Sequence, residues 1–210
     1  MKSGVGLRLQ QAGKRFNRDW IFRELELEIT AGQQIAITGP NGSGKSTLLG
    51  VLSGYQSLSA GQINWQLAGV DLHRDDIYKH IVITAPYLEL PEHLTAAELF
   101  DFHFKLKGKR GADSYAALFD TAGLNHITHK AIRDYSSGMK QRLKLLLVFY
   151  SDVPLLLLDE PTANLDQSGI DWYIKLKAEQ TDGRTLLIAS NQSHEYLGHH
   201  QLININHFKK

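Results

Sequence analysis

Apolar and polar side chains alternate along the early part of the chain. In residues 24–30, Leu25, Leu27 and Ile29 alternate with three glutamates, and this period of two predicts a strand with one face in water. Three shorter segments also have the composition of strands, the second of them antiparallel: residues 33–38, 61–66 and 80–84. The early part of the chain is therefore predicted to be rich in β-structure.

The middle and later parts of the chain carry helical patterns, some with recognisable ends. Thr95 precedes an apolar run and Glu98 follows three residues later, which is the capping-box pattern of a helix start. Gly123 is placed to end another helix. The segments predicted to be helical are residues 46–55, 95–104, 114–123, 137–150 and 169–180.

Residues 153–160, VPLLLLDE, are continuously apolar up to two carboxylates. A run without alternation is typical of a strand buried on both faces of a parallel sheet, and residues 185–190 and 201–206 are predicted to be further strands. We therefore expect an α/β fold with a mostly parallel core sheet and an N-terminal antiparallel β subdomain. A helical subdomain at about residues 87–142 would complete one domain that spans residues 1–210.

Composition and charge narrow the function classes. The chain has 210 residues, enough for one sizeable domain. Its 23 basic and 22 acidic side chains leave a net charge of +1, which argues against a nucleic-acid-binding face. It has no cysteine, which excludes disulfides and thiolate metal sites. The start, MKSGVGLRLQ, lacks the apolar region of a secretory signal, and the apolar runs are shorter than the ~20 residues of a membrane span.

The segment GPNGSGKST matches the phosphate-loop pattern G-x-x-x-x-G-K-[ST]. Gly42 and Gly44 allow the backbone to turn several N–H groups toward one point, and the following helix presents its positive end to phosphates. Lys45 would reach the β- and γ-phosphates, and the Ser46 hydroxyl would hold magnesium. We therefore expect the core of a P-loop NTPase, with candidate phosphate-binding residues Gly39, Pro40, Asn41, Gly42, Ser43, Gly44, Lys45, Ser46 and Thr47.

Two adjacent carboxylates end the buried strand. Asp159 is expected at the carboxyl edge of the sheet, where α/β proteins bind ligands, and is suited to a magnesium contact. Glu160 would point to the other side of the strand end and could orient or deprotonate the attacking water. Together with the phosphate loop, this pair predicts hydrolysis of a nucleoside triphosphate.

At this point the chain resembles the ATP-binding subunits of ABC transporters over nearly its whole length. Residues 135–142, YSSGMKQR, are similar to the signature usually written LSGGQ-x-QR, and residues 159–166, DEPTANLD, match the Walker B and D-loop run. Phe16 stands where the family stacks an adenine ring. The order and spacing of these motifs agree with the family.

The resemblance implies a role for each matching residue. Phe16 would stack on adenine, residues 39–47 would hold the phosphates, and Ser46 and Asp159 would serve magnesium. Glu160 would act on the water. Ser136 and Gly138 would contact the γ-phosphate of ATP bound by a second subunit, and Ser137 and Asp166 are further candidate nucleotide-binding residues. The implied assembly is a head-to-tail homodimer with two ATP at its interface, on an integral membrane permease at the inner, cytoplasmic face of the membrane.

Three motifs depart from the family pattern. Ser137 and Met139 replace a glycine and a glutamine of the signature, and no glutamine stands near Pro86, where the family places its Q-loop. Asn191 stands at the position of the family histidine; its amide can donate a hydrogen bond to the γ-phosphate but cannot titrate near neutral pH. We therefore expect Glu160 and Asn191 to support slow hydrolysis. His194 is an alternative source of an imidazole, although a solvated helical turn is the other interpretation of its position.

The motifs favour an ATP-hydrolysing subunit that powers a separately encoded permease. The short length and the absence of extra domains resemble haem-exporter-type subunits. The alternative is a soluble ABC-type ATPase that acts as an assembly or regulatory switch without transport. Both functions use ATP and Mg²⁺ as cofactors.

Overall fold

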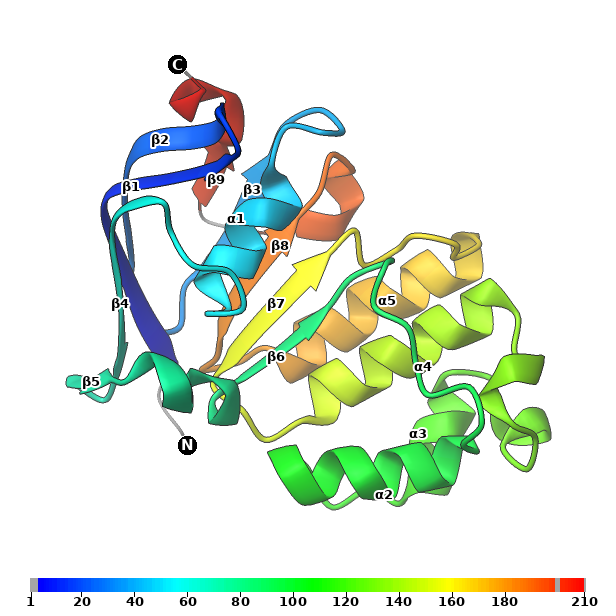
Figure 1. Cartoon of the computed structure of the whole chain (residues 1–210). Helices are drawn as coiled ribbons and strands as arrows, with labels where there is room; N and C mark the ends of the chain where they lie inside the picture. Colours follow the sequence, from blue (N-terminus) through cyan, green and yellow to red (C-terminus); the bar gives the residue numbers. More distant parts are fainter. Residues whose placement is uncertain (1–3, 199–200, 210) are drawn as a thin grey trace.

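A computed structural model of the chain describes residues 4–198 and 201–209. The first part of the chain forms a four-stranded sheet in the order β2-β1-β4-β5, in which neighbouring strands are antiparallel. In Figure 1 this sheet lies at the end of the molecule opposite α2 and α3. Its strands are β1 (Val5–Phe16), β2 (Asp19–Ile29), β4 (Ala60–Leu67) and β5 (Val70–Leu72).

The second sheet is parallel and has the strand order β6-β7-β8-β3-β9. The residues of β7 and β8 are all buried, which is the environment that their unbroken apolar sequences predict. The strands of this sheet are β3 (Gln34–Thr38), β6 (Ile81–Thr84), β7 (Leu155–Asp159), β8 (Thr185–Ala189) and β9 (Gln201–Asn204).

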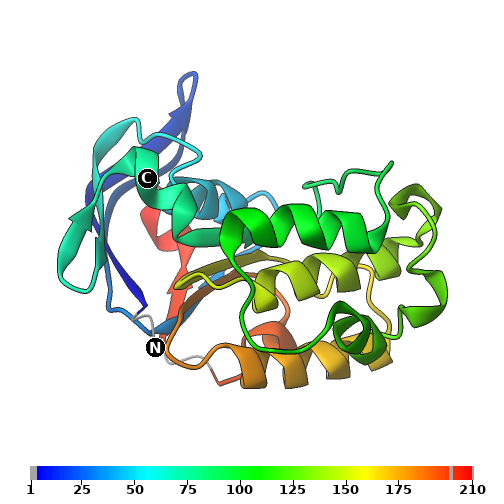
Figure 2. The ribbon, with the colours of Figure 1, turned by 90° about the horizontal axis from the view of Figure 1, so that it is seen from below.

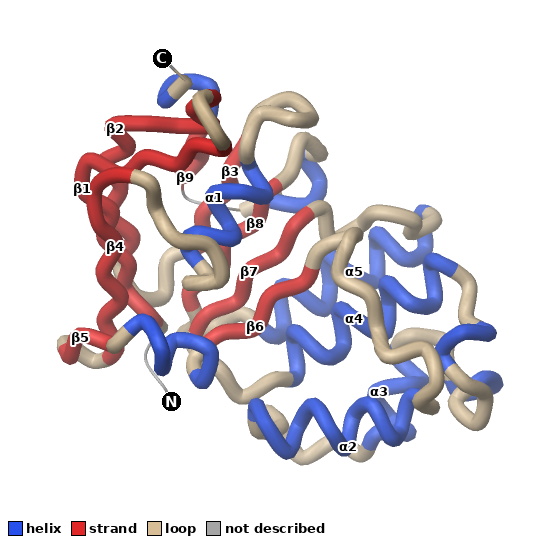
Figure 3. Tube along the Cα trace, viewed as in Figure 1, coloured by secondary structure: helices blue, strands red, loops and turns tan. Residues whose placement is uncertain are grey.

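Each face of the parallel sheet has its own hydrophobic cluster. Leu155 and Leu157 of β7 belong to a cluster with α1 and the antiparallel sheet. Leu156 and Leu158 point to the other face and pack among the remaining helices, as the alternation of side chains along a strand requires. Figures 2 and 3 show α2–α5 gathered at the end of the molecule away from the antiparallel sheet. The helices are α1 (Lys45–Leu52), α2 (Ala96–Lys107), α3 (Tyr115–Thr121), α4 (Ser137–Tyr150) and α5 (Gln167–Gln180).

The local signals at helix ends agree with the structure. Thr95 caps α2 with the complete capping box, in which the Glu98 carboxylate accepts from the Thr95 N–H at 2.8 Å. Gly123 follows α3 with φ of 68°. The helix after the phosphate loop spans Lys45–Leu52, so it ends before residue 55, where the sequence pattern placed its end. The subdomain boundaries at about residues 87–142 stay a prediction, and α4 continues past them to Tyr150.

Two strands were not predicted, β1 and the short β5. The sequence of β1 begins with alternating apolar residues, but its pairing shifts register between Leu9 and Ala12. Gln11 lies within this irregularity at φ of 47°, in the left-handed region that bulges use. The bulge breaks the period of two in the middle of β1, so the pattern that starts at Val5 does not continue.

Among the residues that the structure describes, no helix combines the length and the hydropathy that a membrane span requires.

His103 connects α2 to the end of α4 in a neutral state. Its Nε2 lies 2.7 Å from the Oγ of Ser151, and that Oγ lies 2.6 Å from the carbonyl oxygen of Leu147, to which it donates. Since the Ser151 proton is already used, Nε2 is the donor to Ser151. Burial, and then the charge of Lys107, lower the pKa of His103 to about 4.

This pKa predicts a loss of stability in acid. An unfolded histidine has a pKa of about 6.5, so between these two values the unfolded chain binds more protons and stability falls as pH falls. For a half-buried imidazole we expect His103 to contribute about 1–2 kcal/mol of the loss between about pH 7.5 and about pH 5. Urea unfolding at both pH values measures the difference. His103→Gln should reduce the loss and exposed His126→Gln should not; equal losses in His103→Gln and the unmodified chain would contradict the assignment.

Candidate active site

The register of the parallel sheet brings three loops to one edge. Asp159 at the end of β7 pairs with Ala189 of β8, and Ala189 also pairs with Ile37 of β3. The segments that follow these strands are the phosphate loop, the turn that begins with Glu160, and the loop that contains Asn191. The site predicted from separate motifs therefore has a common position at the carboxyl edge of the sheet.

The phosphate loop has the backbone conformation that its glycines predict. Gly42 and Gly44 have φ of 73° and 103°, in the region that side chains disfavour. A Cβ on Gly44 would also lie 2.3 Å from Cγ2 of Ile21, in β2. Lys45 is 5% exposed, and its Nζ donates to the carbonyl oxygens of Gly39 at 2.9 Å and Pro40 at 3.2 Å. The loop thus leads directly into the N-terminus of α1 with a buried cation at its centre, which suits a phosphate group.

Asp159 is the buried carboxylate of the site. It is 2% exposed, and its Oδ1 has no hydrogen-bond partner. Burial raises its pKa to about 6, a hydrogen bond from Ser46 opposes the rise, and the charge of Glu160 adds to it. A buried carboxylate oxygen without a partner is costly unless a cation binds it. Together with the Ser46 hydroxyl it forms a hard oxygen donor set, which fits Mg²⁺.

Glu160 and Asn191 line the same cavity, of about 290 Å³, which His194 also lines. Glu160 has φ of 43°, and its N–H donates to the carbonyl oxygen of Ala189 at 2.9 Å, which fixes the turn against β8. Asn191 donates from Nδ2 to Oδ1 of Asn41 at 3.2 Å. The asparagine that replaces the expected histidine is therefore in contact with the phosphate loop.

A polar network behind Glu160 has no sequence signal. Glu195 is 1% exposed, and one of its carboxylate oxygens accepts from the N–H of Thr162 at 2.7 Å, while its Oε2 has no partner. The hydroxyl of Thr162 lies 2.9 Å from Nε2 of His194. His194 is therefore half-buried on a short 3₁₀ turn, residues 193–196, and contacts Thr162. This network ties the turn after Asp159 to the loop of Asn191.

The signature residues lie outside this site. Ser136 caps α4, with its Oγ accepting from the N–H of Met139 at 3.3 Å, and Ser137 is exposed. Figure 1 shows the start of α4 well away from the loop between β3 and α1. Gly138 follows in the first turn of α4. The structure therefore does not bring Ser136, Ser137 and Gly138 to the phosphate loop of the same chain.

Two further candidates have local contacts. Asp166 caps α5 by accepting from the N–H of Gly169 at 2.9 Å, and it also accepts from Nη2 of Arg142 at 3.2 Å. Phe16 is 48% exposed at the end of β1, with the Lys14 ammonium 5.0 Å from its ring centre. An exposed aromatic face beside a cation is free to accept a flat ring.

Comparison with known proteins agrees with this geometry. The family model described as ABC transporter matches residues 22–163. The cytochrome c biogenesis ATP-binding export protein CcmA of Xanthomonas axonopodis is 34% identical over 73% of this chain and 71% of its own length. The lantibiotic transport ATP-binding protein SrtF of Streptococcus pyogenes is 30% identical over 88% of this chain and 80% of its own length.

Solved structures share the fold. A putative ABC transporter ATP-binding protein from Pyrococcus furiosus superposes with a TM-score of 0.79 at 18% identity, over 98% of this chain and all of that one. The dimeric ATP-binding cassette MJ0796, bound to ADP and Pi in a post-hydrolysis state, has a TM-score of 0.78 at 22% identity, over 95% and 94% of the two chains.

The chain belongs to the ABC transporter family, as one of its ATP-binding domains. It is an ATPase that binds and hydrolyses ATP and powers a membrane permease. Its α/β fold is the P-loop NTPase fold that the motifs predicted.

Lys45→Ala should remove most of the ATP affinity, because the buried ammonium is the charge closest to the phosphate position. The loss of a charged hydrogen bond predicts a weakening of roughly 10- to 100-fold. Isothermal calorimetry measures it, with Lys105→Ala on the exposed face of α2 as the matched control. Unchanged affinity in Lys45→Ala would show that the phosphates bind elsewhere.

Asn191→His should accelerate hydrolysis. An imidazole carries partial or full positive charge toward the γ-phosphate and strengthens its hydrogen bond in the transition state. We expect a rate increase of roughly 2- to 30-fold, up to ~2 kcal/mol, in steady-state phosphate release.

The gain should vanish in the double variant with Glu160→Gln, because that variant lacks the base. An unchanged or lower rate in a folded, ATP-binding Asn191→His variant would mean that the loop has adapted to asparagine through its contact with Asn41.

Proposed function

We propose that the residues at the carboxyl edge of the sheet perform ATP hydrolysis with the roles that the motifs imply. Ser46 and Asp159 would hold Mg²⁺, and the ion would neutralise part of the phosphate charge. Glu160 would take the proton of the attacking water, and Asn191 would donate to a γ-phosphate oxygen. The observation that carries this proposal is the buried, unpartnered oxygen of Asp159 beside a phosphate loop.

We further propose that catalysis needs two copies of this chain. The N-terminus of α4 is exposed at Ser137 and capped by Ser136, and the positive end of a helix is the chemistry of an anion site. It lies away from the phosphate loop of its own chain, so its anion would be the γ-phosphate of ATP on a second copy. A two-fold, head-to-tail arrangement would then complete two sites at once. Ser136, Ser137, Gly138 and Asp166 would contribute from the partner.

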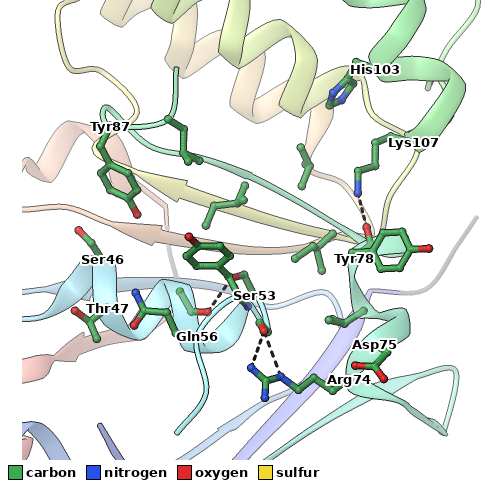
Figure 4. Close-up of a pocket in the computed structure, with 18 residues that line it drawn as sticks. Ser46, Thr47, Ser53, Gln56, Arg74, Asp75, Tyr78, Tyr87, His103 and Lys107 are labelled. Atoms are coloured by element: carbon green, nitrogen blue, oxygen red, sulfur yellow. Dashed lines mark hydrogen bonds between the residues drawn. The ribbon is translucent and has the colours of Figure 1, made fainter. Parts of the chain in front are cut away.

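The permease would be a separately encoded protein that docks in a cavity beside the phosphate loop. This cavity has a volume of about 870 Å³ and reaches from Ser46 and Thr47 at the start of α1 to Lys107 at the end of α2, as Figure 4 shows. The exposed aromatic rings that line it are Tyr55, Tyr78 and Tyr87. Exposed aromatic side chains around a concave surface favour a partner that inserts an apolar helix.

Other features also support a transport role. Leu88, which follows Tyr87 in the chain, also lines this cavity. The names of the relatives, an export protein and a lantibiotic transport protein, are those of transport components. The chain would then lie peripherally at the inner face of the membrane, on its permease.

Glu160→Gln should accumulate an ATP-bound dimer, since removal of the base blocks water attack and keeps the shape of the site. Light scattering with ATP and Mg²⁺ should give twice the protomer mass. Adding Ser137→Glu should prevent the dimer and leave ATP binding intact, because a glutamate is tolerated at a helix start but repels a γ-phosphate. A monomer in Glu160→Gln at every protein concentration, or a dimer in both variants, would contradict the shared site.

Tyr55→Asp should abolish co-purification with the membrane permease, because it places a charge in the apolar docking surface. The control is Phe102→Asp on α2, which is 59% exposed and lies outside the lining of the cavity. ATP affinity should be normal in both. Equal recovery of the permease with both variants would exclude this cavity as the docking site.

A further inference from the structure

The segment after β6 places a tyrosine at the magnesium end of the large cavity. This is the segment, residues 85–94, in which the family glutamine is missing. Tyr87 lines the cavity together with Ser46 and Thr47. Figure 4 shows its ring directed from the loop toward the start of α1, while Tyr78 and Lys107 lie together at the other end. Its hydroxyl therefore faces the part of the site where the γ-phosphate and its ion would bind.

The electrostatic environment of Tyr87 also connects it to this end of the site. Burial raises the pKa of its hydroxyl, and the charge of Asp159 raises it further. The hydroxyl is thus protonated at neutral pH and available as a donor. Its ring is 60% exposed, so the side chain has room to turn onto a ligand.

The same segment is bound to the signature helix. Lys144 of α4 donates from Nζ to the carbonyl oxygen of Ala85 at 3.1 Å and of Pro86 at 3.4 Å. These carbonyls directly precede Tyr87. Since α4 begins with Ser137 after its cap at Ser136, these two hydrogen bonds connect the segment of Tyr87 to the helix that would face the partner's nucleotide.

We propose that Tyr87 is a positioning residue for ATP hydrolysis, whose hydroxyl donates to the oxygen shell of the magnesium-bound γ-phosphate and whose backbone reports this contact to α4 through Lys144. The proposal rests on the magnesium site at Ser46 and Asp159. It assigns to Tyr87 a contact that no other side chain of its segment is placed to make, because Leu88, the neighbour that also lines the cavity, is apolar.

Calorimetry with ATP in the Glu160→Gln background, which has no turnover, tests the contact without measuring activity. Tyr87→Phe keeps the aromatic surface and removes only the hydroxyl. We expect it to raise, by roughly 3- to 10-fold, the Mg²⁺ concentration at which half of the Mg²⁺-dependent gain in ATP affinity is reached; this is the effect of one hydrogen bond. The affinity for metal-free ATP should be unchanged. Tyr78→Phe, at the other end of the cavity, should behave like the parent.

The link to α4 is tested in the same background. Lys144→Met keeps the stem of the side chain and removes its hydrogen bonds; it should leave the Mg²⁺ dependence of monomer binding unchanged. It should raise the ATP concentration needed for dimerisation, measured by light scattering, by roughly 3- to 10-fold. Dimerisation of Lys144→Met at the ATP concentration of the parent would overturn the link.

The outcomes separate this proposal from the one on which it rests. A parent protein whose ATP affinity does not depend on Mg²⁺ would overturn the magnesium site and Tyr87 with it. A normal Mg²⁺ dependence that is the same in Tyr87→Phe and the parent would overturn the role of Tyr87 alone. An equal shift in Tyr87→Phe and Tyr78→Phe would also overturn it, because the hydroxyl at the far end of the cavity cannot contact the ion.

Discussion

A carboxylate at the end of an otherwise apolar strand is the constraint on which this structure depends. Asp159 is 2% exposed, one of its oxygens has no partner, and its pKa is raised to about 6. Such a group lowers the stability of the empty protein. The fold holds it there because β7 lies between β6 and β8 with helices on both faces. A bound cation with its phosphate would offset this cost, so the proposed magnesium site would form at the expense of stability in the empty protein.

The proposed division of the nucleotide site between two chains follows from the same architecture. The phosphate loop and Asp159 lie at the carboxyl edge of the parallel sheet, whereas the signature lies at the start of α4, in the helical part of the molecule. The segment after β6 touches both regions, through Tyr87 at the cavity and through the bonds of Lys144 to Ala85 and Pro86. A partner in this cavity would therefore contact the segment that connects the two halves of the site.

The sequence predicted those features whose signals are local. The phosphate loop, the unbroken apolar run before Asp159 and the capping box at Thr95 each depend on neighbouring residues, and each has the expected form. The strand β1 was missed because its bulge breaks the alternation. The contact between Thr162 and Glu195 joins residues far apart in the chain, and a charged residue in a polar segment gives no sign that it is buried. Tyr87 was missed because the motif describes a glutamine, and its proximity to Ser46 depends on how two loops meet.

Asp159→Asn tests the central claim most directly, because the amide keeps the shape of the carboxylate and removes its charge. A raised pKa means that the charged form is disfavoured in the folded state, so the variant without nucleotide should be as stable as the unmodified chain or more stable, by up to about 3 kcal/mol at about pH 7.5. The same variant should lose the Mg²⁺ dependence of its ATP affinity. Both quantities come from urea unfolding and calorimetry on one preparation. A variant that is less stable and still binds ATP more tightly with Mg²⁺ would contradict the account, since Asp159 would then be a structural residue and the ion would bind elsewhere.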